Sequence, residues 1–339
     1  MLTIFRKRQL KHKLKSRIVT KEDDQTTTTV HNLLANFEQQ QLDNLNLALD
    51  SRDGSCIPCI DLPTKLGGKG TVDLAMAICK AYRWSELQNT SSVKKMPFCK
   101  SSNTICLNPF HYTLFIDIPF TSLDLFNFPN EACQGDESMC SETETGSMCF
   151  QEEIIPSPRS PYPVMTRSRS KHWCSLAYWE RRNRVSRLFP VNHFYVNIFD
   201  RLPKGEGFCL SAVSQTNSES NKVRKCIGTG ITLALDETND DVWLYNRSEY
   251  AVFIHSPILE PLDTRTPLVH KLHPDHCAKV YNFEFATRVK RQRASDTRRR
   301  GRYDGCSIRI SFVKGWGGES YRRQCITTCE CWLEVLFNT

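Results

Sequence analysis

The strongest constraint on the fold is an alternation of apolar and polar residues close to the end of the chain. Between residues 306 and 312 every second side chain is apolar, which predicts a β-strand with one buried face. Three glycines break the pattern within residues 315–318, and residues 331–337 predict another buried strand. A loop held between two such strands is rigidly mounted, and loops of this kind often carry function. This loop presents three cations, Lys314, Arg322 and Arg323, around the aromatic residue Trp316.

The whole chain has 339 residues, enough for two domains of ordinary size and the segments that connect them. No apolar run approaches the roughly 20 residues that span a bilayer, so we expect no membrane insertion. The start of the chain is basic and lacks the apolar core of a signal peptide. We therefore expect a reducing compartment, the nucleus and cytoplasm, in which the 16 cysteines are thiols or metal ligands.

The formal net charge of +8 is unevenly distributed. No lysine or arginine lies between Lys100 and Arg159, whereas cations crowd the start of the chain and its second half. Such a surface suits nucleic acid, anionic lipid or an acidic or phosphorylated protein, and charge alone does not choose among them. A basic run at residues 288–302 predicts a solvated loop, with nuclear import or nucleic-acid contact as the alternative.

The first 54 residues divide into a basic segment and a helical one. Residues 1–26 form a basic arm that we expect to be disordered, with nuclear localisation or anion contact as the sharper alternative. From Val30 to Leu49 apolar residues recur at near-helical spacing, which predicts a helix that packs on a core. Gly54 is a natural terminator for this helix.

A metal site is the strongest chemical signal in residues 55–112. Three cysteines and a histidine supply the thiolate and imidazole ligands that zinc prefers: Cys79, Cys99, Cys106 and His111. Their spacing is not that of a zinc knuckle, so four unrelated side chains remain the alternative. Cys56 and Cys59 form a Cys-x-x-Cys pair, but no thioredoxin-like unit surrounds them to make a redox dithiol.

The later part of the chain returns to a globular pattern after a linker. Residues 116–171 turn acidic and rich in Ser, Thr and Pro, which predicts disorder. Residues 172–339 show short apolar segments separated by turn residues, which predicts a β-sandwich. One amphipathic helix is expected after Pro274, with Val280 and Phe283 along one side.

No motif in the sequence indicates an enzyme. The chain lacks a phosphate-binding glycine loop, an HExxH motif and a nucleophile elbow, so we expect no enzymatic activity. His270, His273 and His276 lie close together in the sequence, but a histidine-rich turn is more often incidental, and a second metal is not favoured.

Several motifs resemble the Smad family over most of the chain. Cys79-Lys80-Ala81-Tyr82-Arg83-Trp84 and Cys106-Leu107-Asn108-Pro109-Phe110-His111 resemble its amino-terminal Mad homology 1 domain. Ser311-Phe312-Val313-Lys314-Gly315-Trp316-Gly317, Tyr321-Arg322-Arg323-Gln324 and Cys331-Trp332-Leu333-Glu334 resemble its carboxy-terminal Mad homology 2 domain. The resemblance implies an α+β zinc-binding domain at residues 27–115 and a β-sandwich with flanking helices, SMAD/FHA-like, at residues 172–339. It also implies one structural Zn2+, bound by Cys79, Cys99, Cys106 and His111, with no ligand role for Cys56 or Cys59.

Within that family the sequence is most similar to inhibitory Smads. The similarity lies in the basic amino terminus, in His172-Trp173-Cys174, in residues 328–335, and in an ending that lacks the Ser-Ser-x-Ser of receptor-activated Smads. It implies an adaptor of TGF-β/BMP signalling that docks on activated type I serine/threonine kinase receptors, or on receptor-activated and common-mediator Smads, and blocks signal-dependent transcription. Because the family's carboxy-terminal domain forms trimers, a homotrimer is also implied. The implied docking residues are Lys222, Arg224, Lys225, Lys314, Trp316, Arg322 and Arg323.

Two departures from the family pattern bear on further partners. DNA-binding Smads read bases with a hairpin that carries Arg, Gln and Lys, whereas residues 62–73 offer only Lys65 and Lys69, which suit phosphate better. A DNA-binding transcriptional regulator acting through the zinc domain is the alternative function, with weak DNA binding expected. Ser160-Pro161-Tyr162 lacks the Pro-Pro-x-Tyr spacing that recruits WW-domain ubiquitin ligases, so that route is not expected.

Overall fold

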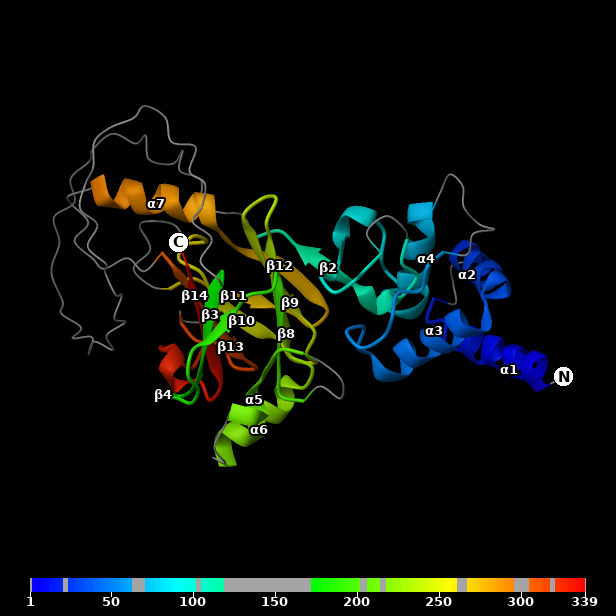
Figure 1. Cartoon of the computed structure of the whole chain (residues 1–339), viewed down its shortest axis with the longest axis horizontal. Coiled ribbons are helices and arrows are strands. Elements are labelled where there is room, and N and C mark those ends of the chain that lie inside the picture. Colours follow the sequence, from blue (N-terminus) through cyan, green and yellow to red (C-terminus); the bar gives the residue numbers. More distant parts are fainter. Residues whose placement is uncertain are drawn as a thin grey trace. The chain divides into compact units, whose positions relative to one another are not determined.

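The computed structural model describes residues 2–20, 24–62, 71–101, 105–118, 172–201, 206–213, 218–260, 267–295, 305–317 and 321–338 (Figure 1). The amino-terminal domain is mainly helical, with α1 (Leu2–Ser16), α2 (Asp24–Asn36), α3 (Gln39–Ser51) and α4 (Thr71–Tyr82). The domain encloses large apolar side chains that are fully shielded from water. These include Leu14, Leu34, Phe37, Leu42, Leu45, Ile78 and Leu107.

The helix expected between Val30 and Leu49 is divided into α2 and α3. A capping box starts α3, in which the backbone N–H of Glu38 donates to Gln41 Oε1 at 2.8 Å. The end of α3 is set by Arg52, whose left-handed backbone (φ 54°) lets its N–H donate to the carbonyl of Ala48 at 2.9 Å. Gly54, the terminator expected from the sequence, lies in the loop that follows.

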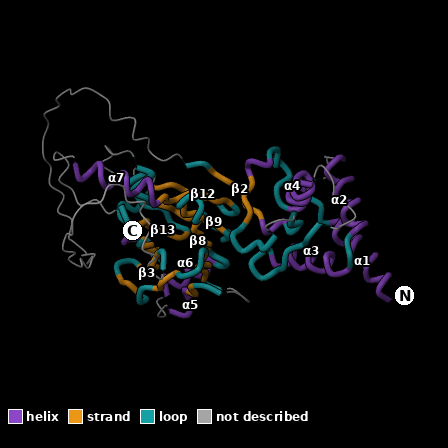
Figure 2. The backbone as a smooth tube through the Cα atoms, turned by 45° about the horizontal axis from the view of Figure 1, so that its top comes forward, coloured by secondary structure: helices purple, strands orange, loops and turns teal. Residues whose placement is uncertain are grey.

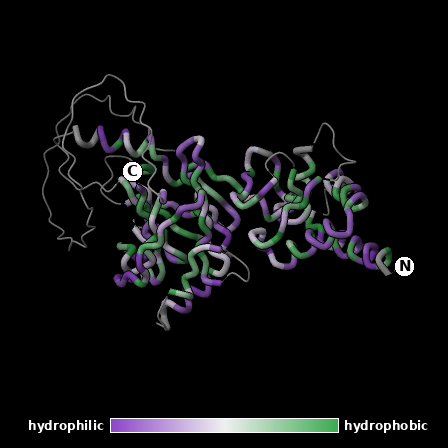
Figure 3. The backbone as a smooth tube through the Cα atoms, in the orientation of Figure 1, coloured by the Kyte–Doolittle hydropathy of each residue, from purple (hydrophilic) through white to green (hydrophobic). Residues whose placement is uncertain are grey.

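The basic segment at the start of the chain is helical rather than disordered, so the expectation for residues 1–26 was wrong there. Leu14 on α1 is fully buried, and Ile18 just beyond it is 6% exposed in the same core. Lys11 Nζ donates to the carbonyl of Ala35 at 2.7 Å, which ties α1 to α2. Apolar residues four positions apart anchor the helix, although most of its length is hydrophilic (Figure 3).

A short antiparallel strand pair follows the helices, and the last predicted metal ligand lies directly before its second strand. β1 (Val93–Lys95) pairs antiparallel with β2 (Tyr112–Ile116), next to the short helices η2 (Thr90–Ser92) and η3 (Pro109–His111). Asn108 caps η3, because its side-chain oxygen accepts the N–H of Phe110 at 3.0 Å. His111 is therefore held at a fixed position, directly before β2.

The carboxy-terminal domain is a β-sandwich, as the sequence predicted (Figure 2). One seven-stranded sheet has the order β1-β2-β12-β9-β8-β6-β7, and the other has the order β11-β10-β13-β14-β3-β4 with β5 beside β3. Buried residues of both sheets, such as Leu233 and Leu244 in one and Ile310 and Leu333 in the other, form a single core. The strands are β3 (Cys174–Glu180), β4 (Asn183–Arg184), β5 (Phe189–Val191), β6 (Tyr195–Phe199), β7 (Phe208–Cys209), β8 (Ile231–Asp236), β9 (Asp241–Asn246), β10 (Val252–His255), β11 (Val269–Leu272), β12 (His276–Asn282), β13 (Ser307–Phe312) and β14 (Trp332–Phe337).

The two strands that the sequence predicted near the end of the chain are confirmed as β13 and β14. They pair antiparallel, with Ile310 opposite Leu333. The flanking helices are α5 (Leu210–Val213), α6 (Ser218–Ile227), α7 (Phe283–Ser295) and η5 (Ile326–Thr328). The expected amphipathic helix is α7, but it begins only at Phe283, because Val280 belongs to β12 and packs in the sandwich core.

Candidate metal centre and basic surface

Three thiols and one imidazole meet in the amino-terminal domain. The ligand atoms of Cys59, Cys99, Cys106 and His111 all lie within 4.8 Å of one another. An isolated β-bridge between Asp61 and Cys106 brings Cys59 beside Cys106, and η3 presents His111. Cys106 and His111 are buried, whereas Cys59 and Cys99 are half-buried. The cluster therefore joins segments that are up to 52 residues apart in the sequence.

The spacing of these atoms fits a tetrahedral zinc ion. Zn–S distances of about 2.3 Å and Zn–N distances of about 2.0–2.1 Å give tetrahedron edges of about 3.8 Å between sulfurs and about 3.5 Å between sulfur and nitrogen. Cys59 Sγ lies 3.8 Å from Cys99 Sγ and 3.5 Å from His111 Nδ1. Cys106 Sγ lies 3.4 Å from the same nitrogen. The residues present thus fit the metal in both chemistry and size.

The second nitrogen of the histidine fixes its orientation. His111 Nε2 lies 3.0 Å from the carbonyl oxygens of both Gly54 and Ile57. Carbonyls can only accept, so Nε2 carries the proton and Nδ1 keeps its lone pair toward the three sulfurs. The ring of Phe98 packs edge-on against the imidazole at a centroid distance of 5.5 Å. This arrangement holds the imidazole ready to coordinate a metal.

Hydrogen bonding within the cluster shifts the pKa values of two of the thiols in opposite directions. A hydrogen bond from Cys106 lowers the pKa of Cys99 to about 4, while the same bond and burial raise the pKa of Cys106. One thiolate is therefore already favoured in the cluster, and a bound cation would displace the remaining protons.

The structure corrects the predicted ligand set at one position. Cys79 lies on α4, is 1% exposed and is not part of the cluster, whereas Cys59 is. Burial raises the pKa of Cys79 to about 12, as expected for a thiol that packs in a core. The mistaken assignment followed a sequence motif, but the ligand set depends on the bridge between Asp61 and Cys106. The second cysteine of the Cys-x-x-Cys pair was the signal that could have found it.

Other groups singled out in the sequence do not join a metal cluster among the described residues. Cys56 contacts Ser55 Oγ at 3.7 Å. His276 Nδ1 lies 2.7 Å from the carbonyl of Pro274, and Cys277 is fully buried in an apolar cluster. Lys65 and Lys69, which the sequence offers only for weak phosphate contact, lie outside the described residues, as do residues 119–171 of the linker.

The predicted docking residues on α6 divide into exposed and buried ones. Lys222 and Lys225 are exposed. Arg224 is 8% exposed and is bound by two acids, at 3.0 Å from Glu180 and 3.2 Å from Asp200. Arg224 therefore holds α6 on the sandwich and is not free to contact a partner.

The predicted docking residues in the loop between β13 and β14 also divide into buried and exposed ones. Trp316 is 3% exposed and packs with Phe253 and Trp332. Arg323 pairs with Glu330 at 3.0 Å. Arg322 is exposed, and Lys314 is half-buried. Gly315 is needed here, because a Cβ at this position would lie 2.5 Å from the Tyr321 ring. The loop is thus a folded platform, and within the part of the chain that the structure describes no ion pair to Lys314 or Arg322 is found.

Helix α6 and this loop are connected through Glu330. Ser220 Oγ at the start of α6 donates to the Glu330 carbonyl at 3.4 Å, and the Glu330 carboxylate holds Arg323. The Cys331 thiol donates to the Ser220 carbonyl at 3.5 Å. The structure therefore brings the two predicted segments into one region of the sandwich domain.

An α+β domain with a Cys3His cluster, followed by a β-sandwich with flanking helices, defines a protein of the MH1–MH2 class. The MH1 domain family matches residues 26–116, and the MH2 domain family matches residues 171–338. The chain is 34% identical over 338 residues to Mothers against decapentaplegic homolog 7 of Mus musculus, covering 91% of this chain and 77% of that protein. It is 34% identical over 343 residues to Mothers against decapentaplegic homolog 6 of Gallus gallus, covering 96% of this chain and 77% of that protein. The chain belongs to the Smad family.

These relatives are inhibitory Smads of TGF-β/BMP signalling, so the prediction of an inhibitory Smad-type chain is confirmed, and it fits better than the DNA-binding alternative. Members of the family transduce signals and regulate transcription without enzymatic activity. The crystal structure of the interferon regulatory factor 9 IAD domain is similar with a TM-score of 0.36 and 9% identity, over 53% of this chain and 87% of that chain, which is too low to carry an argument. Within the described ranges no helix has the length and apolarity needed to cross a bilayer.

Proposed function

We propose that the sandwich domain docks through a basic surface on activated type I receptors of the TGF-β/BMP family and thereby excludes receptor-activated and common-mediator Smads. The observation that supports this proposal is a set of cations for which no ion pair is found among the described residues. The set comprises Lys222 and Lys225 on α6 and Lys314 and Arg322 in the β13–β14 loop. We call these four side chains the basic surface.

Uncommitted cations suit the chemistry of a phosphorylated receptor. A phosphoserine carries about −1.5 to −2 charges at neutral pH and accepts strong charge-assisted hydrogen bonds from Lys and Arg. A cation that is already paired would have to give up its partner before binding, whereas these four have no such partner among the described residues. The basic surface thus favours a phosphorylated or acidic protein segment as the partner.

The three remaining predicted docking residues act as supports rather than contacts. Arg224 fixes α6 through Glu180 and Asp200, and Arg323 fixes the loop through Glu330. Trp316 fills the space beneath the loop. Rigid presentation reduces the ordering cost of binding, which improves affinity without adding a contact.

The amino-terminal domain contributes a structural metal centre. Cys59, Cys99, Cys106 and His111 would hold one Zn2+, which would clip four chain segments together and stabilise the domain's fold. We further propose that the protein acts in both nucleus and cytoplasm and that its sandwich domain assembles as a homotrimer, as the family resemblance implies.

A reconstituted kinase reaction tests the proposed inhibition. An activated type I receptor kinase domain phosphorylates a receptor-activated Smad in the presence of increasing amounts of the full, zinc-loaded chain. We expect phosphorylation to fall, with half-inhibition shifting to higher concentrations as the Smad substrate is raised. A chain with Lys222, Lys225, Lys314 and Arg322 all changed to Glu should not inhibit. Undiminished inhibition by this variant would remove the basic surface from the mechanism.

A further inference from the structure

The edge of the first sheet is completed by the amino-terminal domain. β2 pairs in parallel with β12, with Leu114 opposite His276 and Ile116 opposite Ala278. Phe115 packs against Trp243 of β9 at a centroid distance of 5.5 Å, and Lys94 Nζ lies 3.7 Å from the centre of the same indole. Both domains belong to one compact unit. The two domains are thus joined by main-chain pairing and by an apolar contact.

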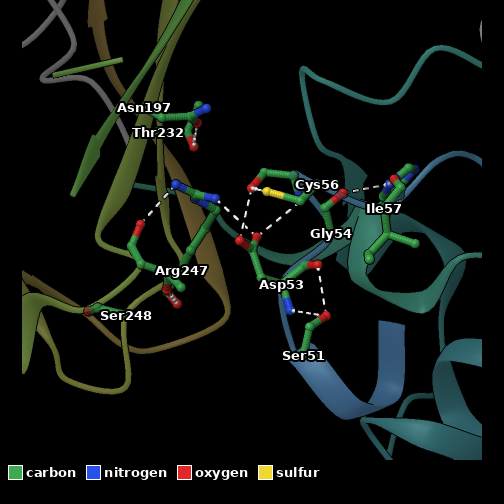
Figure 4. Close-up of polar contacts among 12 residues, drawn as sticks. Ser51, Asp53, Gly54, Cys56, Ile57, Asn197, Thr232, Arg247 and Ser248 are labelled. Carbon is green, nitrogen blue, oxygen red and sulfur yellow. Dashed lines mark hydrogen bonds and ion pairs between the residues drawn. The ribbon is translucent and has the colours of Figure 1, made fainter. Parts of the chain in front are cut away.

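A buried ion pair adds to this junction (Figure 4). Arg247 Nη1 lies 3.2 Å from Asp53 Oδ1, and the two side chains are each 9% exposed. Arg247 Nη2 also donates to the carbonyl of Thr229 at 2.8 Å, which anchors the guanidinium within the sandwich domain. A buried carboxylate facing a buried guanidinium sets the position of one domain against the other much more strictly than a surface pair could.

Asp53 belongs to the same loop that holds the metal ligand His111. The carbonyls of Gly54 and Ile57 both accept from His111 Nε2 at 3.0 Å. Asp53 Oδ1 accepts from the N–H of Ser55 at 3.0 Å, which fixes the carboxylate within the loop. Gly54 approaches so closely that a Cβ there would lie 2.3 Å from the carbonyl oxygen of Phe110. The loop therefore cannot move away from His111 without moving Asp53.

We propose that metal binding at the Cys3His cluster is energetically coupled to the docking of the two domains through the loop of residues 53–57. A bound ion fixes His111, His111 fixes the two loop carbonyls, and the loop places Asp53 against Arg247. Coupling between two equilibria is reciprocal, so docking must strengthen metal binding by the same factor by which metal strengthens docking. Loss of the metal would then expose the edge of β12 for pairing with another strand. The inference rests on the proposed metal centre.

The test measures the zinc affinity of the full chain by competition with a chromophoric chelator. Arg247→Gln changes a residue of the other domain that is not a metal ligand, yet we expect it to weaken zinc binding by roughly 5- to 150-fold, the usual range for coupled sites. Asp53→Asn should do the same, and the double variant should be no weaker than either single one. The control is Arg309→Gln, which removes an ion pair with Glu334 in the second sheet and should leave zinc affinity unchanged.

Hydrogen exchange on the same samples reports docking directly. In zinc-loaded Arg247→Gln we expect faster exchange in β2 and β12 and unchanged exchange in β13 and β14. Should β13 and β14 also loosen, Asp53→Asn becomes the deciding variant, because it leaves the sandwich sequence intact. Zinc affinity within twofold of wild type in both variants, or additive effects in the double variant, would overturn the coupling. A wild-type chain that binds no zinc would instead refute the metal centre itself.

Discussion

The variant Arg224→Met tests whether Arg224 stabilises the sandwich domain rather than contacting a partner. The Arg224 side chain is 10% exposed, and the facing side chains of Glu180 and Asp200 are 8% and 5% exposed. Methionine has a similar reach but leaves both carboxylates without their shared guanidinium. Removing one partner of a buried charge pair costs about 3–5 kcal/mol, because the remaining charge stays buried without compensation. For a domain of this size we expect the unfolding temperature to fall by about 6 to 20 °C.

Differential scanning calorimetry of the zinc-loaded full chain measures this change. Lys222→Met on the same helix is the matched control, because exposed substitutions usually change stability by no more than about 0.5 kcal/mol. Adding Glu180→Gln to Arg224→Met should recover part of the loss, since one of the two unpaired carboxylates becomes neutral. Equal unfolding temperatures for Arg224→Met and Lys222→Met would refute the reasoning, as would further destabilisation by Glu180→Gln.

Three further predictions concern the metal cluster, a histidine and the loop. Cys59→Ser should abolish stoichiometric zinc in elemental analysis, whereas Cys79→Ser should retain it; the reverse result would restore the ligand set expected from sequence. Burial lowers the pKa of His270 below its ordinary value of 6.5. At pH values between these two pKa values, the folded state therefore binds fewer protons at His270 than the unfolded state does. Stability should therefore be full above about pH 6.5 and fall as pH drops through that window, and unfolding titrations of His270→Asn should lack this loss. Gly315→Ala should lower the free energy of unfolding by about 1–3 kcal/mol, because the added Cβ would lie 2.5 Å from the Tyr321 ring. An unchanged midpoint of denaturant unfolding would show that the loop accommodates the Cβ without cost.

The sandwich was predictable because local alternation reports which face of a strand is buried. Ile308 and Ile310 are fully buried, as the period of two between residues 306 and 312 predicted. The other face of this strand is also largely covered, because Ser307 and Ser311 are buried and only Arg309 stays partly exposed. The helical character of α1 was not predicted, because its many cations concealed the apolar residues that anchor it. Leu14 and Ile18 reach the core only because α1 packs on other helices, which is a tertiary effect.

The candidate site was predictable in kind but not in every residue. Ligand chemistry and motif resemblance identified Cys99, Cys106 and His111, all of which lie in the cluster. Cys59 was missed because it approaches the others through pairing between segments 45 residues apart in the sequence, Asp61 and Cys106. On α6, Arg224 is buried although Lys222 and Lys225 are exposed. Its burial depends on two acids from another strand and another loop, Glu180 and Asp200, and the local sequence of α6 does not predict these partners.

The most direct test of the account is the affinity of the full, zinc-loaded chain for a phosphorylated type I receptor kinase domain. Calorimetric titration would compare wild type, a chain with Lys222→Glu, Lys225→Glu, Lys314→Glu and Arg322→Glu, and a control with Lys290→Glu and Arg291→Glu on α7, whose side chains are also exposed. We predict binding that weakens with salt and with receptor dephosphorylation, survives in the α7 control and is lost in the basic-surface variant. Equal affinity in all three chains would contradict docking through the basic surface.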